Sequence, residues 1–219
     1  MQSPLYLLRD DPQLFVAFVI AIVVAITVHE FSHAAVATLE GDDTARSAGR
    51  LTLNPLSHLD PLGSIFLVLV GFGWGRPTPF NPARLHNQRV GAALVGLAGP
   101  ASNFLLALLS ALALRLSHPQ GIDVFEANSS FTVKLLLRFV QLNVLLGVFN
   151  LLPIPPLDGS RLLSILLPPS RQGIVYFLDQ YGIFLLIGLL FLAPGLLAPV
   201  FTQLEDLVLR LVGVRFVGL

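Results

Sequence analysis

The chain has 219 residues, of which 54% are hydrophobic and only 12% are charged, and its mean hydropathy is +0.78. Globular proteins carry about 25% charged residues, so this composition cannot form a soluble surface and indicates a membrane protein. Thirteen Lys and Arg balance thirteen Asp and Glu, which leaves no net positive charge to attract nucleic acid. There is no cysteine, so any metal ion must be bound by His, Asp or Glu.

Four apolar segments are long enough to cross a bilayer, whose hydrocarbon core of about 30 Å requires about 20 helical residues. The first, residues 14–39, is too long and starts too far into the chain to be a cleavable signal sequence, and it contains three ionisable residues. The other three are residues 90–116, 133–152 and 174–200. We expect each of the four to be a transmembrane helix.

A fifth apolar segment, residues 62–72, is too short to cross. It follows Asp60-Pro61 and leads into the glycine-rich residues 71–75. An apolar segment of 10 to 14 residues is typical of a re-entrant loop, which enters and leaves the membrane on the same face. We therefore predict a re-entrant segment here.

The C-terminal residues, 201–219, mix charged residues with Leu and Val at helical spacing, which predicts an amphipathic helix at the membrane interface. Residues 50–53 and 78–80 resemble short extended pieces and predict a small β element. The predicted fold is an all-α polytopic membrane protein with about four full transmembrane helices, a re-entrant segment and a small β element. Its length favours one domain, residues 1–219.

The distribution of basic residues predicts the orientation in the membrane. If the re-entrant segment does not cross, seven of the thirteen basic residues lie on one side, which the positive-inside rule assigns to the cytoplasm. These seven are Arg46, Arg50, Arg76, Arg84, Arg89, Arg161 and Arg171.

The residues His29-Glu30-Phe31-Ser32-His33 form an HExxH pattern inside the first apolar segment. A helix turns about 100° per residue, so the two His at i and i+4 lie within about 40° of each other and can bind one metal ion. Glu30 points about 60° to 100° away, where it can take a proton from a metal-bound water without acting as a ligand. The motif predicts two metal ligands and a general base.

Such a motif could instead arise by chance, or it could form a polar cluster that serves packing alone. A chain with this His and Glu content contains such a match about 0.002 times by chance. Each ionisable group at membrane depth costs some 2.5 to 3.5 kcal/mol, which makes a cluster without a ligand expensive. We therefore interpret the motif as a metal site.

A catalytic zinc usually has three protein ligands, and Asp158 is the best candidate for the third. It follows the proline-rich residues 153–156, where a broken helix lets an inward-facing carboxylate approach the metal. His29 and His33 lie near the end of their span, and Asp158 follows the end of another. The ends of these two spans lie on the same side of the membrane only if residues 62–72 do not cross it. The alternative role of Asp158 is to cap the helix that begins near Ser160.

Three motifs resemble the site-2 protease family of intramembrane zinc metalloproteases. They are HEFSH in an apolar helix, Gly99-Pro100-Ala101-Ser102-Asn103 in a later span, and residues 150–159 with their final Leu-Asp-Gly. Residues 49–63 and 74–82 also resemble the small bacterial members, which lack a PDZ or CBS domain. The resemblance covers about residues 18–163, which we take as the metal-binding core, followed by a C-terminal span and interfacial helix at 174–219.

The resemblance implies one Zn²⁺ per chain, bound by His29, His33 and Asp158, with Glu30 as the catalytic residue. It also implies hydrolysis of peptide bonds in a transmembrane protein or peptide substrate by a zinc-activated water. The location is then a bacterial cell membrane, with the site toward the cytoplasmic side. The alternative function is a divalent-metal transporter that uses the same His, Glu and Asp cluster as a transit site.

Three further polar residues are candidates for the site. Asn103 and Asn150 could each donate a hydrogen bond to the oxyanion or to the substrate backbone, or could instead form hydrogen bonds between helices. His58 could line the site, or it could be an ordinary residue of the turn in which it lies.

Overall fold

The computed structural model describes residues 4–70, 73–123, 130–192 and 194–217, and most of them are helical. The α-helices are α1 (Pro4–Asp10), α2 (Pro12–Leu39), α3 (Thr44–Ser47), α4 (Pro61–Val70), α5 (Gln88–Ser117), α7 (Phe131–Asn150), α8 (Leu163–Leu166), α9 (Gln172–Leu192) and α10 (Pro194–Val212). Short 3₁₀ helices are η1 (Pro55–Ser57), η2 (Pro82–Arg84), η3 (Asp158–Leu162) and η4 (Pro169–Arg171), and two short strands are β1 (Ile122–Asp123) and β2 (Phe216–Val217).

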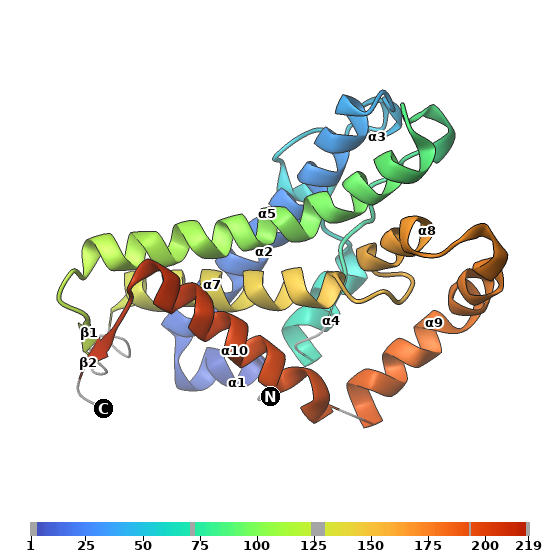
Figure 1. Ribbon diagram of the computed structural model, residues 1–219. Coiled ribbons are helices and arrows are strands. Elements are labelled where there is room, and N and C mark those ends of the chain that lie inside the picture. Colours follow the sequence, from blue (N-terminus) through green and yellow to red (C-terminus); the bar gives the residue numbers. More distant parts are fainter. Residues whose placement is uncertain (1–3, 71–72, 124–129, 193, 218–219) are drawn as a thin grey trace.

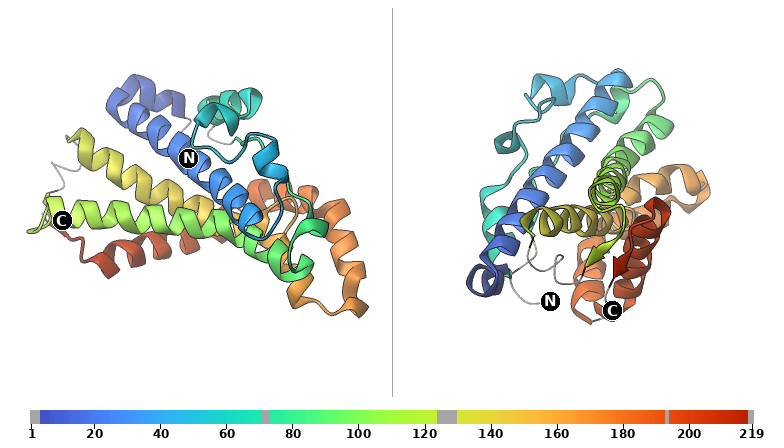
Figure 2. Two further views of the ribbon diagram at one scale, coloured as in Figure 1. Left: turned by 90° about the horizontal axis from the view of Figure 1, so that it is seen from above. Right: turned by 90° about the vertical axis from the view of Figure 1, so that its left-hand side faces the viewer.

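The core consists of α2, α5 and α7, which pack side by side (Figures 1 and 2). Within the described residues, these are the three helices long and apolar enough to cross a membrane. They agree with three of the four predicted spans. Five alanines of α2 are completely buried, and such small residues let helix backbones approach closely where lipid provides no hydrophobic driving force.

An ion pair joins the start of α2 to the start of α7. Asp11 caps α2 by accepting a hydrogen bond from the Leu14 N–H at 3.1 Å, and Pro12 occupies the first helical position. The other oxygen of the Asp11 carboxylate accepts a hydrogen bond from the buried Lys134 ammonium at 2.6 Å. This contact holds the pKa of the Asp11 carboxyl below its usual value.

The predicted fourth span, residues 174–200, is not one helix. It is divided between α9 and α10 around Ala193, which lies outside the described residues. Proline has no backbone N–H and is favoured at the start of a helix, so Pro194 is well suited to begin α10. In Figure 1, α9 runs outside the core while α10 returns to it.

The predicted helix within residues 201–219 forms as the second part of α10. This helix packs along α5 and α7 (Figure 1), whereas its position relative to the membrane interface stays a prediction. Its apolar side chains Leu204, Val208 and Leu209 join the cluster formed by those two helices. The amphipathic stripe is therefore buried against protein.

The predicted re-entrant segment corresponds to α4, whose ten residues are about 15 Å long, half of the bilayer core. The chain before and after it meets at one end of the bundle. The His86 N–H donates to Glu40 O at 2.8 Å, and the Asn81 N–H donates to the Asp42 carboxylate at 2.5 Å. Residues 71 and 72, the end of the predicted segment, lie outside the described residues.

The predicted β element is wrong in position. Residues 50–53 and 78–80 form no strand, because their backbone groups bind side chains instead: Thr52 O accepts from His58, and the Thr78 N–H donates to Glu30. The strands that do form, β1 and β2, pair in parallel at the far end of α5. An isolated bridge joins Leu59 to Gly75.

The position of α4 predicts which residues are accessible from each side of the membrane. In this cysteine-free chain, we expect Arg46→Cys and Arg84→Cys to react with an impermeant thiol reagent from the same side, and Gln120→Cys, which follows α5, from the other. Labelling of single-cysteine variants in oriented vesicles measures this. Labelling of positions 46 and 84 from opposite sides would contradict the re-entrant arrangement.

Candidate metal centre

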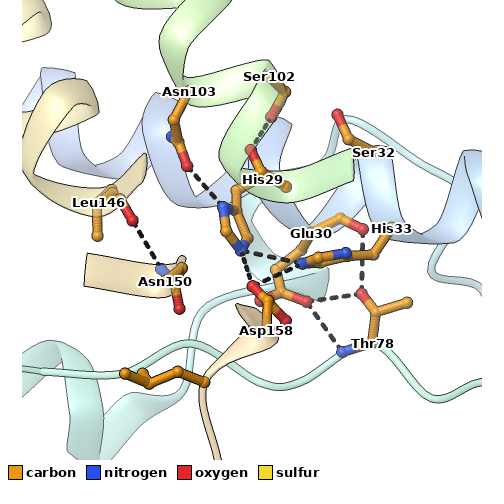
Figure 3. A network of polar contacts seen from close by, with 12 residues as sticks. His29, Glu30, Ser32, His33, Thr78, Ser102, Asn103, Leu146, Asn150 and Asp158 are labelled. Atoms are coloured by element: carbon orange, nitrogen blue, oxygen red, sulfur yellow. Dashed lines mark hydrogen bonds and ion pairs between the residues drawn. The ribbon is translucent and has the colours of Figure 1, made fainter. Parts of the chain in front are cut away.

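The two histidines of the HExxH motif lie one turn apart on α2, and both are buried. Their Nε2 atoms are 3.0 Å apart. The carboxylate oxygen Oδ2 of Asp158 lies 3.0 Å from Nε2 of His29 and 3.2 Å from Nε2 of His33 (Figure 3). Three residues separated by as much as 129 positions in the chain therefore place one potential ligand atom each at a single point.

Asp158 reaches this point from the start of η3, directly after the proline-rich residues 153–156. The N-cap of η3 is Leu157, and no side chain caps this helix. Capping therefore does not explain the carboxylate. The following glycine is required by space, because a Cβ on Gly159 would lie 2.2 Å from Leu151 O.

Helix α5 binds the outer nitrogens of both histidines. The His29 Nδ1–H donates to Asn103 Oδ1 at 2.6 Å, and the His33 Nδ1–H donates to the backbone oxygen of Val95 at 2.6 Å. In this tautomer, each Nε2 carries a lone pair directed at Asp158. The two acceptors on α5, Asn103 Oδ1 and Val95 O, thus orient both rings so that their Nε2 atoms can bind a metal ion.

A second layer supports Asn103. Its amide donates to Asn143 Oδ1 at 2.8 Å, and the Asn143 amide donates to Phe139 O at 2.9 Å on α7. Both asparagines are completely buried. The chain of hydrogen bonds fixes the orientation of Asn103, and through it the orientation of the His29 ring.

The donor set fits zinc. Among the described residues, His29, His33 and Asp158 form a group whose ligand atoms all lie within 4.8 Å of one another. Two imidazole lone pairs and a carboxylate oxygen in contact repel each other unless a proton or a cation lies between them. Tetrahedral zinc with bonds of about 2.0 to 2.2 Å separates its ligands by about 3.3 to 3.6 Å, close to the separations found here.

The same side of α5 carries glycines where it faces the site. A Cβ on Gly99 would lie 2.5 Å from Nε2 of His29 and 2.5 Å from Nε2 of His33. A Cβ on Gly96 would lie 2.9 Å from Asp158 O. Glycine at these two positions lets α5 approach the histidine rings and η3 this closely.

Glu30 faces a different partner from its two histidine neighbours. One oxygen of its carboxylate, Oε2, accepts hydrogen bonds from the Thr78 N–H at 2.9 Å and from the Thr78 hydroxyl at 2.7 Å (Figure 3). Thr78 belongs to residues 73–81, which lie beside α2. Two residues on, the Arg161 guanidinium stacks 4.2 Å from the centre of the Phe80 ring, which ties this segment to the residues after Asp158.

The three further candidates occupy different places. Asn103 lies behind His29, with both ends of its amide bound as described above. Asn150 lies at the end of α7 beside Asp158 (Figure 3), and its amide donates to Leu146 O at 3.1 Å. His58 is completely buried and donates to Thr52 O at 2.7 Å, and it is not part of the group of ligand atoms.

Sequence reasoning offered residues 78–80 as an extended edge for a substrate, but it did not give Thr78, Gly99 or Val95 a role in orienting the histidines or Glu30. Gly99 had a signal, since it belongs to a Gly-Pro motif in a span, but the side that it faces depends on how α5 packs. Val95 acts through its backbone oxygen, which leaves no signal in a sequence. Thr78 lies 48 positions from Glu30, and only the folded segment brings them together.

The close approach of Gly99 predicts loss of metal when a methyl group is added. In Gly99→Ala the new Cβ would collide with both Nε2 atoms, so we expect at least a tenfold weaker zinc affinity. Gly188→Ala is the control, because a Cβ there meets nothing within 4 Å. Zinc titration of both purified variants measures this, and wild-type affinity in Gly99→Ala would refute the placement of α5.

Comparison with known proteins agrees with this site. Residues 113–193 match peptidase family M50. The chain is 41% identical over 201 residues to a Bacillus subtilis protein named "Putative zinc metalloprotease YwhC", covering 90% of this chain and 91% of that protein. It is also 37% identical over 191 residues to the Mycobacterium tuberculosis (H37Rv) protein named "Putative zinc metalloprotease Rip2", covering 83% of this chain and 69% of that protein.

A third relative, also named "Putative zinc metalloprotease Rip2", comes from Mycolicibacterium smegmatis and is 34% identical over 187 residues, covering 83% of this chain and 69% of that protein. No solved structure matches the chain. The high coverage of the Bacillus relative extends the likeness well beyond the matched residues 113–193. Together with the His, His and Asp group, these matches identify a zinc metalloendopeptidase: the chain belongs to peptidase family M50, the site-2 proteases.

Proposed function

We propose that the chain cuts peptide bonds within the membrane-embedded part of transmembrane proteins or peptides. His29, His33 and Asp158 hold the zinc ion, and Glu30 is the general base. The observation that carries this proposal is the convergence of three ligand atoms within 4.8 Å, next to a carboxylate on the same turn of α2. No accessory group besides the metal is needed for hydrolysis by this set of residues.

The chemistry divides between the metal and the chain. Zinc, when bound, supplies a Lewis acid that polarises the substrate carbonyl and lowers the pKa of water. Glu30 accepts the proton of the attacking water and passes it to the nitrogen of the leaving amine, so that the peptide bond breaks and no proton is left over. Thr78 holds one oxygen of the Glu30 carboxylate, which keeps the side chain turned away from the ligand group.

The surroundings of the site support a membrane substrate. His29 and His33 lie in α2, whose buried neighbours are mainly alanine and other apolar residues, and the helix is flanked by α5 and α7. A substrate segment that reaches this site is therefore surrounded by apolar helices and lipid. We propose that the bilayer is its solvent and that the site faces the cytoplasmic side of a bacterial cell membrane.

The supporting residues receive separate roles. Asn103, bound to His29 and Asn143, orients the ring of His29. Asn150 uses only its amide nitrogen in the contact with Leu146, and we propose that its oxygen receives a backbone N–H of the substrate. His58 holds the turn before α4 through its bond to Thr52 and contributes to the shape of the site.

The first test separates the base from the ligands. Glu30→Gln keeps the size of the side chain and can still accept the Thr78 hydrogen bonds, but it cannot take up a proton. We expect near-stoichiometric zinc and a loss of cleavage of about 10² to 10⁴-fold. Zinc content and cleavage of a tagged single-span reporter are measured on the same preparation.

One set of results would contradict the assignment as a protease. If the wild type moves divalent ions across vesicles and cuts no membrane reporter, and Glu30→Gln loses zinc, then the chain is a transporter and the assignment of Glu30 as a base is wrong.

The second test addresses Asp158. We expect Asp158→Asn to lose most of its zinc, because the amide supplies neither the negative charge nor an equally strong ligand oxygen. Arg161→Gln, in the same short helix η3, is the control for damage to that helix. Zinc content and thermal stability of both variants decide the matter, and full zinc occupancy with full activity in Asp158→Asn would exclude it as a ligand.

A further inference from the structure

An apolar cavity of about 100 Å³ lies between α2 and α4. Phe18, Ile22 and Ile26 of α2 form one wall, and Leu67 and Val68 of α4 form the other. The lining also includes Ser64, but its hydroxyl donates to Asp60 O at 2.7 Å and is already satisfied. The cavity therefore offers an apolar surface with no free hydrogen-bonding group among these side chains.

One lining residue of the cavity, Ile26, lies near Glu30. Ile26 lies one turn before Glu30 on the same side of α2. A Cβ on Gly75 would lie 3.1 Å from Cγ2 of Ile26 and 3.9 Å from Oε1 of Glu30, so the backbone of Gly75 stands between the two. Leu59, another lining residue, pairs with Gly75 in a bridge. The cavity and the proposed base are thus neighbours on α2, separated by the backbone of Gly75.

The position of α4 leaves this space open. Helix α4 packs against α1, and its first turn is held by the Asp60 carboxylate, which accepts from the Gly63 N–H at 2.8 Å. The rings of Phe66 and Trp74 lie 5.7 Å apart and tie the helix to the residues that follow it. Because α4 is held at these points, the gap beside α2 is part of the folded structure.

The size of the cavity matches one side chain. An apolar cavity of about 150 Å³ in a protein interior binds benzene, so about 100 Å³ accommodates a branched aliphatic group such as that of Leu or Val. Burial of a charged or unpaired polar group against this lining would be unfavourable. The occupant that fits is therefore aliphatic.

The distance from the base limits where such a side chain belongs in a substrate. One helical turn, about 5.4 Å, separates Ile26 from Glu30. An extended peptide advances about 3.3 Å per residue, so a side chain in the part of the cavity lined by Ile26 lies within two residues of the bond beside Glu30.

We propose that this cavity is a specificity subsite, which accepts an aliphatic side chain of the substrate within two residues of the cleaved bond. The inference rests on the proposed protease function and adds a rule for choosing the cleavage position. The closeness of the cavity to Glu30, with only the backbone of Gly75 between them, supports a substrate side chain as the occupant. A lipid acyl chain is the other apolar group available in a bilayer, and the test separates the two.

The test uses single-span reporters that differ only at positions within two residues of the cleaved bond, with Leu, Ala or Asp at each. For the wild type in lipid vesicles, we expect one position at which Leu is cut at least tenfold more efficiently than Ala, measured as kcat/KM, and at which Asp is cut least. Zinc content is measured in parallel for every variant.

A variant that fills the cavity gives the second arm. Val68→Phe should reduce kcat/KM for the Leu reporter about tenfold or more and leave the Ala reporter within about twofold of the wild type. Ile65→Phe is the matched control, since Ile65 is exposed on the same helix and does not line the cavity, and it should change neither reporter.

The possible failures are distinguishable. A wild type that cuts the reporters but shows no preference for Leu over Ala at these positions would overturn the subsite alone. Equal loss on the Leu and Ala reporters in Val68→Phe would indicate that lipid or packing, and not a substrate side chain, fills the space. A zinc-loaded wild type that cuts no reporter would overturn the proposed function and this inference together.

Discussion

The metal centre depends on how two imidazole rings are accommodated inside an apolar bundle. A buried ring nitrogen without a partner is costly, and each ring has two nitrogens. Helix α5 satisfies the outer nitrogen of His29 with Asn103 and that of His33 with the backbone of Val95. Both inner nitrogens are then directed at Asp158, an arrangement of three electron-rich atoms that a bound cation stabilises. Packing of α5 against α2 thus determines the chemistry of the site.

This requirement explains the composition of α5 around its proline. The helix must approach α2 closely enough to accept hydrogen bonds from both rings, so side chains are excluded where it faces them, at Gly96 and Gly99. Four residues after Gly99, a side-chain acceptor must reach the Nδ1–H of His29, and Asn103 supplies it. Its partner Asn143 extends the same network to α7, so all three core helices contribute to the orientation of His29.

Periodicity and depth predicted that His29, His33 and Asp158 lie close together, as they do in the structure. The spacing of His29 and His33 places both rings on one side of a helix. If residues 62–72 do not cross the membrane, the number of spans between His33 and Asp158 brings Asp158 to the same end of the bundle, where the structure has it. Apolar length alone could not reveal that residues 174–200 divide at a proline, or that α10 packs against α5 and α7. The expected strand at residues 78–80 failed because the N–H of Thr78 has a stronger acceptor, the Glu30 carboxylate, than a neighbouring strand would offer.

Helix α2 therefore presents two different surfaces within a single turn. His29 and His33 face α5, a rigid neighbour that fixes their tautomers, whereas Glu30 faces residues 73–81, which are anchored through α4 and through Phe80. Closely packed α5 leaves no room for a peptide on the histidine side. The side of Glu30 differs, because an apolar cavity lies nearby between α2 and α4, beyond the backbone of Gly75. We therefore propose that a substrate reaches the proposed ligands and base from the side of α4, so that this short helix serves recognition while the three long helices hold the metal-binding side chains.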